Sequence, residues 1–143
     1  MKTIALIASL FIGLSSCQSA DNTTTDSKTE TTQNPGEQKP VVQDLKQSDL
    51  SSKMAEENVV VIDVRTPGEV SEGYITGANL FIDFYGENFQ SEILKLDKTK
   101  TYVMYCRSGG RSGQASTFMV NNGFATVYNL QGGIGSYTGT IAK

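Results

Sequence analysis

The residues best suited to carry chemistry lie in one short stretch, Cys106-Arg107-Ser108-Gly109-Gly110-Arg111-Ser112. A cysteine acts as a nucleophile in its thiolate form, which nearby arginines and helix N-termini favour. Glycines at positions 109 and 110 permit backbone angles that turn several N–H groups toward one point. The stretch therefore predicts a thiol with a lowered pKa inside an anion-binding loop.

The composition limits which other residues or metal sites could act together with this thiol. The chain has 143 residues, two cysteines, no histidine and a formal net charge of −3. Without histidine it can form neither a Ser-His-Asp triad nor a Cys-His dyad. It also cannot supply the four Cys or His ligands typical of a structural zinc site. We therefore expect no metal and no cofactor, and the acidic balance gives no sign of a nucleic-acid partner.

The elements on either side of the loop place it at the end of a strand. Residues 101–105 form a β-rich run that ends just before Cys106. Residues 112–122 have a helical pattern that ends before Gly123, a typical helix C-terminal residue. Ligands in open α/β sheets bind outside the carboxyl ends of the strands. The predicted order of strand, loop and helix thus favours a functional site.

From Val41 onward the sequence has the pattern of one modest domain, residues 41–143. Strand-like runs alternate with helical ones, which predicts an α/β fold with a mainly parallel sheet. Thr66-Pro67-Gly68-Glu69 has the form of a capping box at a helix start. The predicted strands are 41–43, 59–62, 79–82, 101–105 and 126–128, and the predicted helices are 48–55 (with Ser48 as N-cap), one beginning at 66, 88–96 and 112–122.

The loop from Cys106 to Ser112 resembles the active-site loop of rhodanese-like domains. Three further stretches resemble motifs of the same family and follow in the expected order: residues 60–69 (VVIDVRTPGE), 73–79 (GYITGAN) and 129–134 (NLQGGI). The resemblance covers residues 41 to about 137. It implies a three-layer α/β domain whose central, mainly parallel sheet is flanked by helices.

The resemblance also implies a reaction. Cys106 would be the catalytic residue of a sulfurtransferase and would carry sulfur as a persulfide. The donor would be a thiosulfate-like anion, and the acceptor would be cyanide or a thiol. Residues that would bind the substrate are the rest of the loop: Arg107, Ser108, Gly109, Gly110, Arg111 and Ser112. Related phosphatases use a Cys-x₅-Arg loop, whereas four residues separate Cys106 from Arg111 here, so the shorter loop favours sulfur over phosphate.

Two charged residues at the end of a buried strand leave two readings open. Asp63 and Arg65 follow the β-branched run of residues 59–62. The favoured interpretation is a structural network at the strand end. The alternative is an accessory role, in which Arg65 helps to attract the anionic donor.

The N-terminus has the form of a lipoprotein signal. Residues 4–14 are apolar or small, and at about 1.5 Å per helical residue they cover only half of a bilayer core of about 30 Å. Residues 1–16 therefore fit a signal peptide, and Leu14-Ser15-Ser16-Cys17 resembles a lipobox. The resemblance implies lipidation of Cys17, and the polar residues 17–40 predict a tether. We expect a monomer anchored by lipid in the bacterial cell envelope, on a periplasmic or outer-membrane face.

Two further hypotheses stay open from the sequence. The domain could be a sulfur or redox relay, or persulfide carrier, that depends on a protein partner such as an envelope thioredoxin-like protein. It could also be a non-catalytic binding module. The retained Cys106 argues against the last of these.

Overall fold

The computed structural model describes residues 40–143, so the predicted signal peptide, Cys17 and nearly all of the tether lie outside the described residues. The centre of the domain is a five-stranded sheet with the order β1-β6-β5-β2-β4, and every pairing in it is parallel. Its strands are β1 (Gln43–Leu45), β2 (Val59–Asp63), β4 (Leu80–Phe81), β5 (Thr101–Tyr105) and β6 (Thr126–Leu130). A separate antiparallel pair joins β3 (Tyr74–Ile75) to β7 (Ile141–Ala142).

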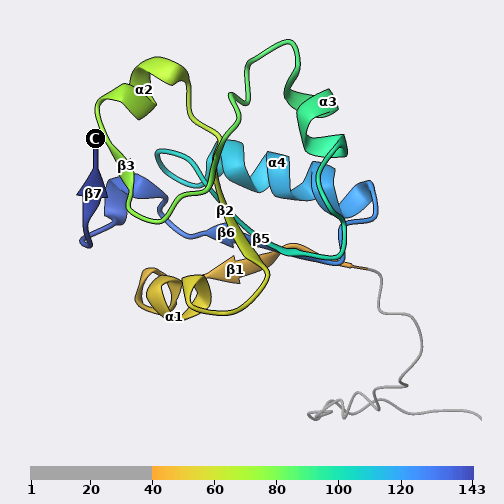
Figure 1. Ribbon diagram of the computed structural model, residues 1–143, viewed down its shortest axis with the longest axis horizontal. Helices are drawn as coiled ribbons and strands as arrows, with labels where there is room; N and C mark the ends of the chain where they lie inside the picture. Colours follow the sequence, from red (N-terminus) through yellow and green to blue (C-terminus); the bar gives the residue numbers. More distant parts are fainter. Residues whose placement is uncertain (1–39) are drawn as a thin grey trace, which may run out of the picture. The chain divides into compact units, whose positions relative to one another are not determined.

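Helices cover both faces of the sheet and make three layers (Figure 1). α3 (Phe89–Leu94) and α4 (Gly110–Asn121) pack on one face, and α1 (Leu50–Met54) packs on the other. α2 (Pro67–Ser71) has no buried residue and follows β2 directly. Short 3₁₀ turns occupy Gln47–Asp49 and Ile134–Ser136. The prediction of a three-layer α/β domain with a mainly parallel sheet is confirmed.

Alternate residues of the central strands belong to two different hydrophobic clusters, one on each face of the sheet. Ile62 and Met104 lie in the cluster with α3 and α4, whereas Val61 and Val103 lie in the cluster with α1. All four side chains are at most 1 % exposed. Burial on both faces explains why β2 and β5 read as continuous apolar runs, as parallel strands do.

Several predicted boundaries are confirmed and others are wrong. β5 has the predicted bounds, and both reciprocal bonds of the capping box between Thr66 and Glu69 are present. The first strand begins at Gln43 rather than Val41, because pairing with β6 starts there. Ser48 is not an N-cap: its hydroxyl bonds to the Asp49 carboxylate, 2.7 Å away, inside a 3₁₀ turn.

The last long helix begins at Gly110, two residues before the predicted start. Gly109 is its N-cap, with a φ of +99° that a glycine adopts easily. The loop that follows Cys106 is therefore shorter than predicted. Residues 110–112 already belong to the first turn of α4. Within residues 40–143, no helix has the length and apolarity needed to cross a membrane.

Candidate active site

Cys106 lies directly after β5, at the carboxyl end of the sheet, and only 1 % of its surface is exposed. The chain then turns through Arg107, Ser108 and Gly109 into α4. The turn is tight enough that the Gly109 N–H donates to the Cys106 Sγ across 3.2 Å. The loop thus wraps backbone donors around the sulfur, as the sequence predicted.

The surroundings of the sulfur favour its thiolate. Burial opposes ionisation of Cys106, but hydrogen bonds from the Ser112 hydroxyl and from the backbone amides of Ser112, Ser108 and Gly109 outweigh it. The pKa of Cys106 therefore lies below its ordinary value. The Ser112 Oγ lies 3.5 Å from the sulfur. A thiol stabilised as its anion by fixed donors is suited to nucleophilic attack.

A second loop holds the first one in place. The N–H groups of Ile134 and Gly135 donate to the carbonyls of Cys106 and Arg107 across 2.9 and 2.8 Å. Gly133 lies so close that a Cβ there would collide with the Cys106 carbonyl oxygen, so only glycine fits. The Gln47 side chain in turn donates to the Gly133 carbonyl across 2.9 Å. Residues 132–134, the Gly-Gly-Ile part of the last motif, thus support the loop that contains Cys106.

Ser112 has a further partner that sequence reasoning did not single out. Its hydroxyl donates to the Asn129 Oδ1 across 2.6 Å, and Asn129 comes from the neighbouring strand β6. This contact fixes the rotamer of Ser112, whose oxygen faces the sulfur. Asn129 opens a motif that the sequence marked, but nothing local in the sequence points to a contact with Ser112.

The two loop arginines, both of which the sequence assigned to donor binding, have different surroundings. Arg111 makes a bidentate ion pair with Glu69 of α2, with both N–O distances at 2.7 Å. This pairing holds the pKa of Glu69 at about 2 and raises that of Arg111. Arg107 is exposed and makes no ion pair with any residue from 40 to 143. Arg107 is therefore the loop cation left free for an incoming anion.

Asp63 and Arg65 form a buried pair close to the site. The Arg65 Nη2 lies 2.7 Å from the Asp63 Oδ2, and the guanidinium also donates to the carbonyls of Glu69 and Gly73. Beneath it lies the Tyr105 ring, 5.9 Å from the guanidinium carbon, and burial and the Asp63 charge raise the pKa of that phenol. With its donors occupied in this way, Arg65 fits the structural interpretation better than the accessory one.

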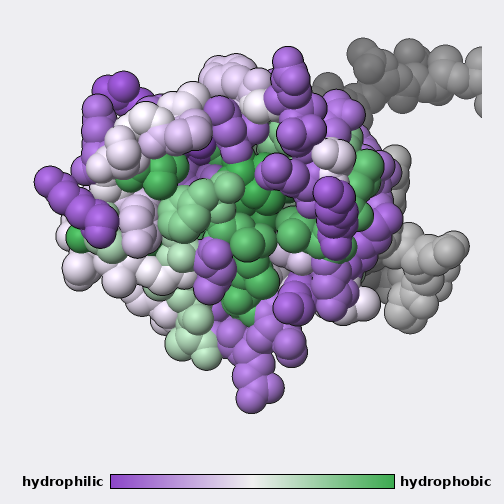
Figure 2. All heavy atoms as spheres, turned by 45° about the horizontal axis from the view of Figure 1, so that its top comes forward, coloured by the Kyte–Doolittle hydropathy of each residue, from purple (hydrophilic) through white to green (hydrophobic). Residues whose placement is uncertain are grey.

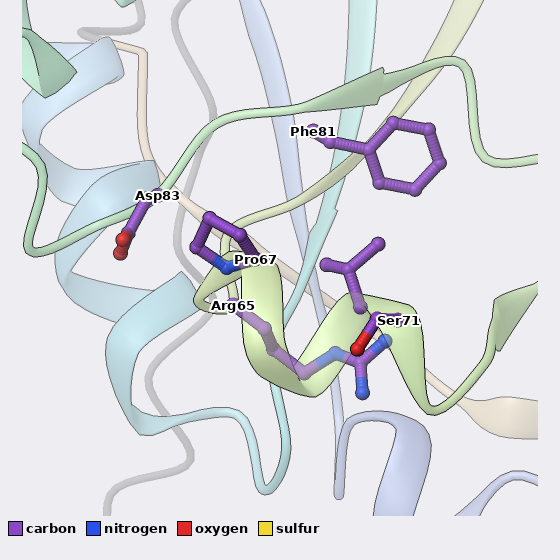
Figure 3. A pocket seen from close by; sticks show the side chains of 6 residues that line it. Arg65, Pro67, Ser71, Phe81 and Asp83 are labelled. Carbon is purple, nitrogen blue, oxygen red and sulfur yellow. The ribbon is translucent and has the colours of Figure 1, made fainter.

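A pocket of about 270 Å³ lies between α2 and the end of β4. Figure 3 shows Phe81 on the β4 side and Pro67 and Ser71 on the α2 side. Figure 2 shows hydrophobic side chains gathered near the middle of the face in view, with hydrophilic ones around them. None of the residues 106–112 lines the pocket, which is formed by Arg65, Pro67, Val70, Ser71, Phe81 and Asp83. The pocket and the reactive sulfur are thus separate features.

The predicted site residues therefore fall into three groups. Those around the sulfur are Cys106, Ser108, Gly109 and Ser112, with Gly110 in the first turn of α4. Arg107 and Arg111 form the charged part of the loop, and Asp63 and Arg65 belong to the buried network. Cys17 lies outside the described residues. The catalytic and binding roles of all these residues stay predictions.

Comparisons with known proteins agree with this geometry. A family model described as "Rhodanese-like domain" matches residues 46–140. The chain is 34% identical to a protein of Allochromatium vinosum named "Sulfurtransferase", over 66% of this chain and 86% of that protein. It is also 31% identical to a tRNA uridine(34) hydroxylase of Yersinia pestis, over 65% of this chain but only 27% of that longer protein.

Solved structures show the same fold. A rhodanese-related protein from Thermoplasma volcanium matches with a TM-score of 0.61 and 25% identity, over 70% of this chain and 97% of that one. A rhodanese-like domain protein from Staphylococcus aureus matches with a TM-score of 0.58 and 25% identity, over 68% and 94%. Because the family model covers well over half of the chain and the buried thiol lies in the expected loop, the chain belongs to the rhodanese-like family.

Proposed function

We propose that this protein is a sulfurtransferase that carries sulfane sulfur as a persulfide on Cys106. The observation that carries the proposal is the Cys106 sulfur, which is buried at a strand end and receives the Gly109 N–H at 3.2 Å. The likeness to the Allochromatium vinosum sulfurtransferase supports it, because the match covers 86% of that protein. The tRNA hydroxylase relative supports only the shared domain, since the chain spans about a quarter of that protein's length.

The reaction has two steps. In the first, the Cys106 thiolate attacks the outer sulfur of thiosulfate, the S–S bond of the donor breaks, and sulfite leaves with the bonding electron pair. In the second, a nucleophilic acceptor such as cyanide or a thiol attacks the terminal sulfur of the persulfide. The Cys106–sulfur bond breaks and the thiolate is regenerated. This is covalent catalysis with ping-pong kinetics.

The loop residues have separate parts in this scheme. The backbone N–H groups around the sulfur would stabilise the negative charge of the thiolate and then of the terminal persulfide sulfur. Arg107, exposed and free of an ion pair within residues 40–143, would attract the anionic donor. Ser112, held by Asn129, would keep its oxygen 3.5 Å from the sulfur.

The test is intact-protein mass spectrometry of the fragment 41–143 after treatment with thiosulfate. We expect a gain of one sulfur atom that cyanide or a reducing thiol removes, and no gain in the Cys106→Ser variant. The fragment contains Cys106 as its sole cysteine, so the added mass has one site. If the folded, reduced fragment gains no sulfur, thiosulfate is not the donor. Trapping a mixed disulfide with an envelope thioredoxin-like protein would then favour the relay hypothesis.

We also propose that Cys17 is lipidated and that the domain acts at the cell envelope. The support is the apolar run of residues 4–14 directly before Leu14-Ser15-Ser16-Cys17. Metabolic labelling with a palmitate analogue tests this. Label on the full chain and none on Cys17→Ser is expected, and equal labelling of both would contradict it.

A further inference from the structure

The pocket between α2 and the end of β4 has mostly apolar walls. Pro67 and Val70 of α2 form one side, and Phe81 of β4 forms the other. Phe81 is 45% exposed, and Tyr74 contacts its ring edge-on, with 4.8 Å between the ring centres. An aromatic ring that is held by a neighbour and is open to solvent offers a large apolar contact surface. The walls therefore suit the hydrocarbon part of a ligand.

Asp83 gives the pocket a charge that no ion pair compensates. Its side chain is partly buried, and its Oδ1 accepts the Tyr85 N–H across 2.9 Å. Asp83 makes no ion pair with any residue from 40 to 143. In the view of Figure 3, Pro67 lies between Asp83 and Phe81. A ligand that crosses the pocket can therefore meet the carboxylate with one part and the ring with another.

Arg65 also lines the pocket, but its charge is already compensated. All three guanidinium nitrogens donate to protein oxygens, namely the Asp63 carboxylate and two backbone carbonyls. The Ser71 hydroxyl donates to the Gly68 carbonyl across 2.7 Å, which leaves its oxygen able to accept a bond. Among the lining residues, the groups free to meet a ligand are therefore mainly acceptors. Such a set is complementary to a cation that carries several N–H donors.

We propose that this pocket binds a lysine or arginine side chain of a protein partner. The hydrocarbon stem lies against Pro67, Val70 and Phe81, and the cation at its end meets the Asp83 carboxylate. Long basic side chains commonly bury their stems on apolar surface while the charged head stays at polar groups. The proposal goes beyond sulfur transfer, because binding at this pocket does not involve the Cys106 sulfur.

The position of the pocket favours a protein partner over a free amine. Pro67 and Ser71 are exposed, so the pocket opens at the surface and encloses a small ligand on one side only. Glu69 lies on α2 between two lining residues, and it is paired with Arg111 in the first turn of α4. A chain whose basic side chain fills the pocket can therefore continue across α2 toward the loop of Cys106. A free amine has no such additional contact to make.

The first test follows the binding of small probes to the isotope-labelled full chain by NMR. The probes are blocked alanine tripeptides whose central residue is lysine, norleucine or glutamate, together with n-butylamine. At millimolar concentration the lysine peptide should shift the amide signals of Val70, Ser71 and Asp83. The norleucine peptide keeps the stem without the charge and should bind about fivefold more weakly, the equivalent of about 1 kcal/mol for one charge contact in water.

Four outcomes of this test would overturn the proposal. Equal affinity for the lysine and norleucine peptides would mean that the pocket recognises apolar chains alone. Tighter binding of the glutamate peptide would identify Arg65, and not Asp83, as the recognition group. Binding of n-butylamine as tight as that of the lysine peptide would make the pocket a small-amine site. No shift of these amide signals with the lysine peptide would show that the pocket does not bind a basic side chain.

The second test uses Asp83→Asn, which removes the charge and keeps the Oδ1 that accepts the Tyr85 N–H. Binding of the lysine peptide should weaken about fivefold, and binding of the norleucine peptide should change less than twofold. The matched control is Glu87→Gln, which removes an equal charge from an exposed residue of the same loop that does not line the pocket. The control should change binding of the lysine peptide less than twofold. Equal losses in the two variants would mean that only the net charge matters, and would overturn the assignment to Asp83.

Discussion

Two arginine–carboxylate pairs contact α2, and they differ in burial and in what else they touch. Arg65 and Asp63 have side chains 7% and 0% exposed, and the arginine also donates to two backbone carbonyls. Arg111 and Glu69 are 16% and 26% exposed and lie at the edge of the catalytic loop. The same chemical pairing therefore occurs in two different environments in one small domain.

The difference follows from the cost of desolvation. A fully buried charge that loses its partner has no water to replace it, so the inner pair is essential to the fold once it is present. A partly exposed charge can be hydrated when its partner leaves, so the outer pair can be changed without loss of the fold. The outer pair is thus the one that can be removed while the domain stays folded.

The largest expected effect comes from breaking the inner pair. Arg65→Met leaves the Asp63 carboxylate buried without a partner and should lower the free energy of unfolding by about 3–5 kcal/mol. Arg111→Met should cost less than about 1 kcal/mol, because Glu69 is then hydrated. Urea unfolding followed by circular dichroism measures both. If Arg65→Met does not fold, Arg65→Lys gives an intermediate value, and equal losses for the two Met variants would end the distinction between the pairs.

A second prediction asks whether hydrogen bonds, rather than either ion pair, favour the thiolate. Ser112→Ala removes a hydroxyl from the sulfur and touches neither pair. The midpoint of the pH dependence of iodoacetamide alkylation should move to higher pH, and the rate at pH 7 should fall by about fivefold. An unchanged midpoint in Ser112→Ala would assign the lowered pKa to the loop backbone alone.

A third prediction concerns the loss of folding stability at low pH. The pKa of Glu69 lies at about 2 in the folded protein, well below its ordinary value of 4.5. Its contribution to stability is therefore present above pH 4.5 and is lost as the pH falls from 4.5 toward 2. Allowing for solvent screening, the loss should be about 1 kcal/mol. Comparing urea unfolding at pH 5 and pH 3 in wild type and Arg111→Met measures it, and the variant should lose less. The same loss in both would show that Glu69 does not titrate through this pair.

The smallest expected effect comes from a third ion pair on the surface. Lys53 and Glu56 lie 2.8 Å apart with side chains 19% and 53% exposed. Glu56→Gln should change the free energy of unfolding by less than about 0.5 kcal/mol. Urea unfolding at pH 7 provides the measurement, and a loss above 1 kcal/mol would show that exposure does not rank the pairs.

Local features of the domain could be predicted from the sequence because adjacent residues encode them. The β5 strand, the Thr66 capping box and the helix end at Gly123 are confirmed, since each depends on contacts within a few residues. The loop around Cys106 follows from its glycines and from its position after a strand. By contrast, the antiparallel pair of β3 and β7 was not predicted, because two-residue strands leave no pattern to read.

What the sequence by itself determined is the class of fold and the position of Cys106 in a loop directly after a strand. What the tertiary structure decided is how the charges around that thiol are distributed. Glu69 lies 42 residues from Arg111, and Asn129 lies 17 residues from Ser112. These contacts depend on the strand order β6-β5-β2, which brings distant segments to the carboxyl edge of β5. Pairings of that kind arise from the packing of whole elements, so no local spacing of residue types could reveal which loop arginine is free.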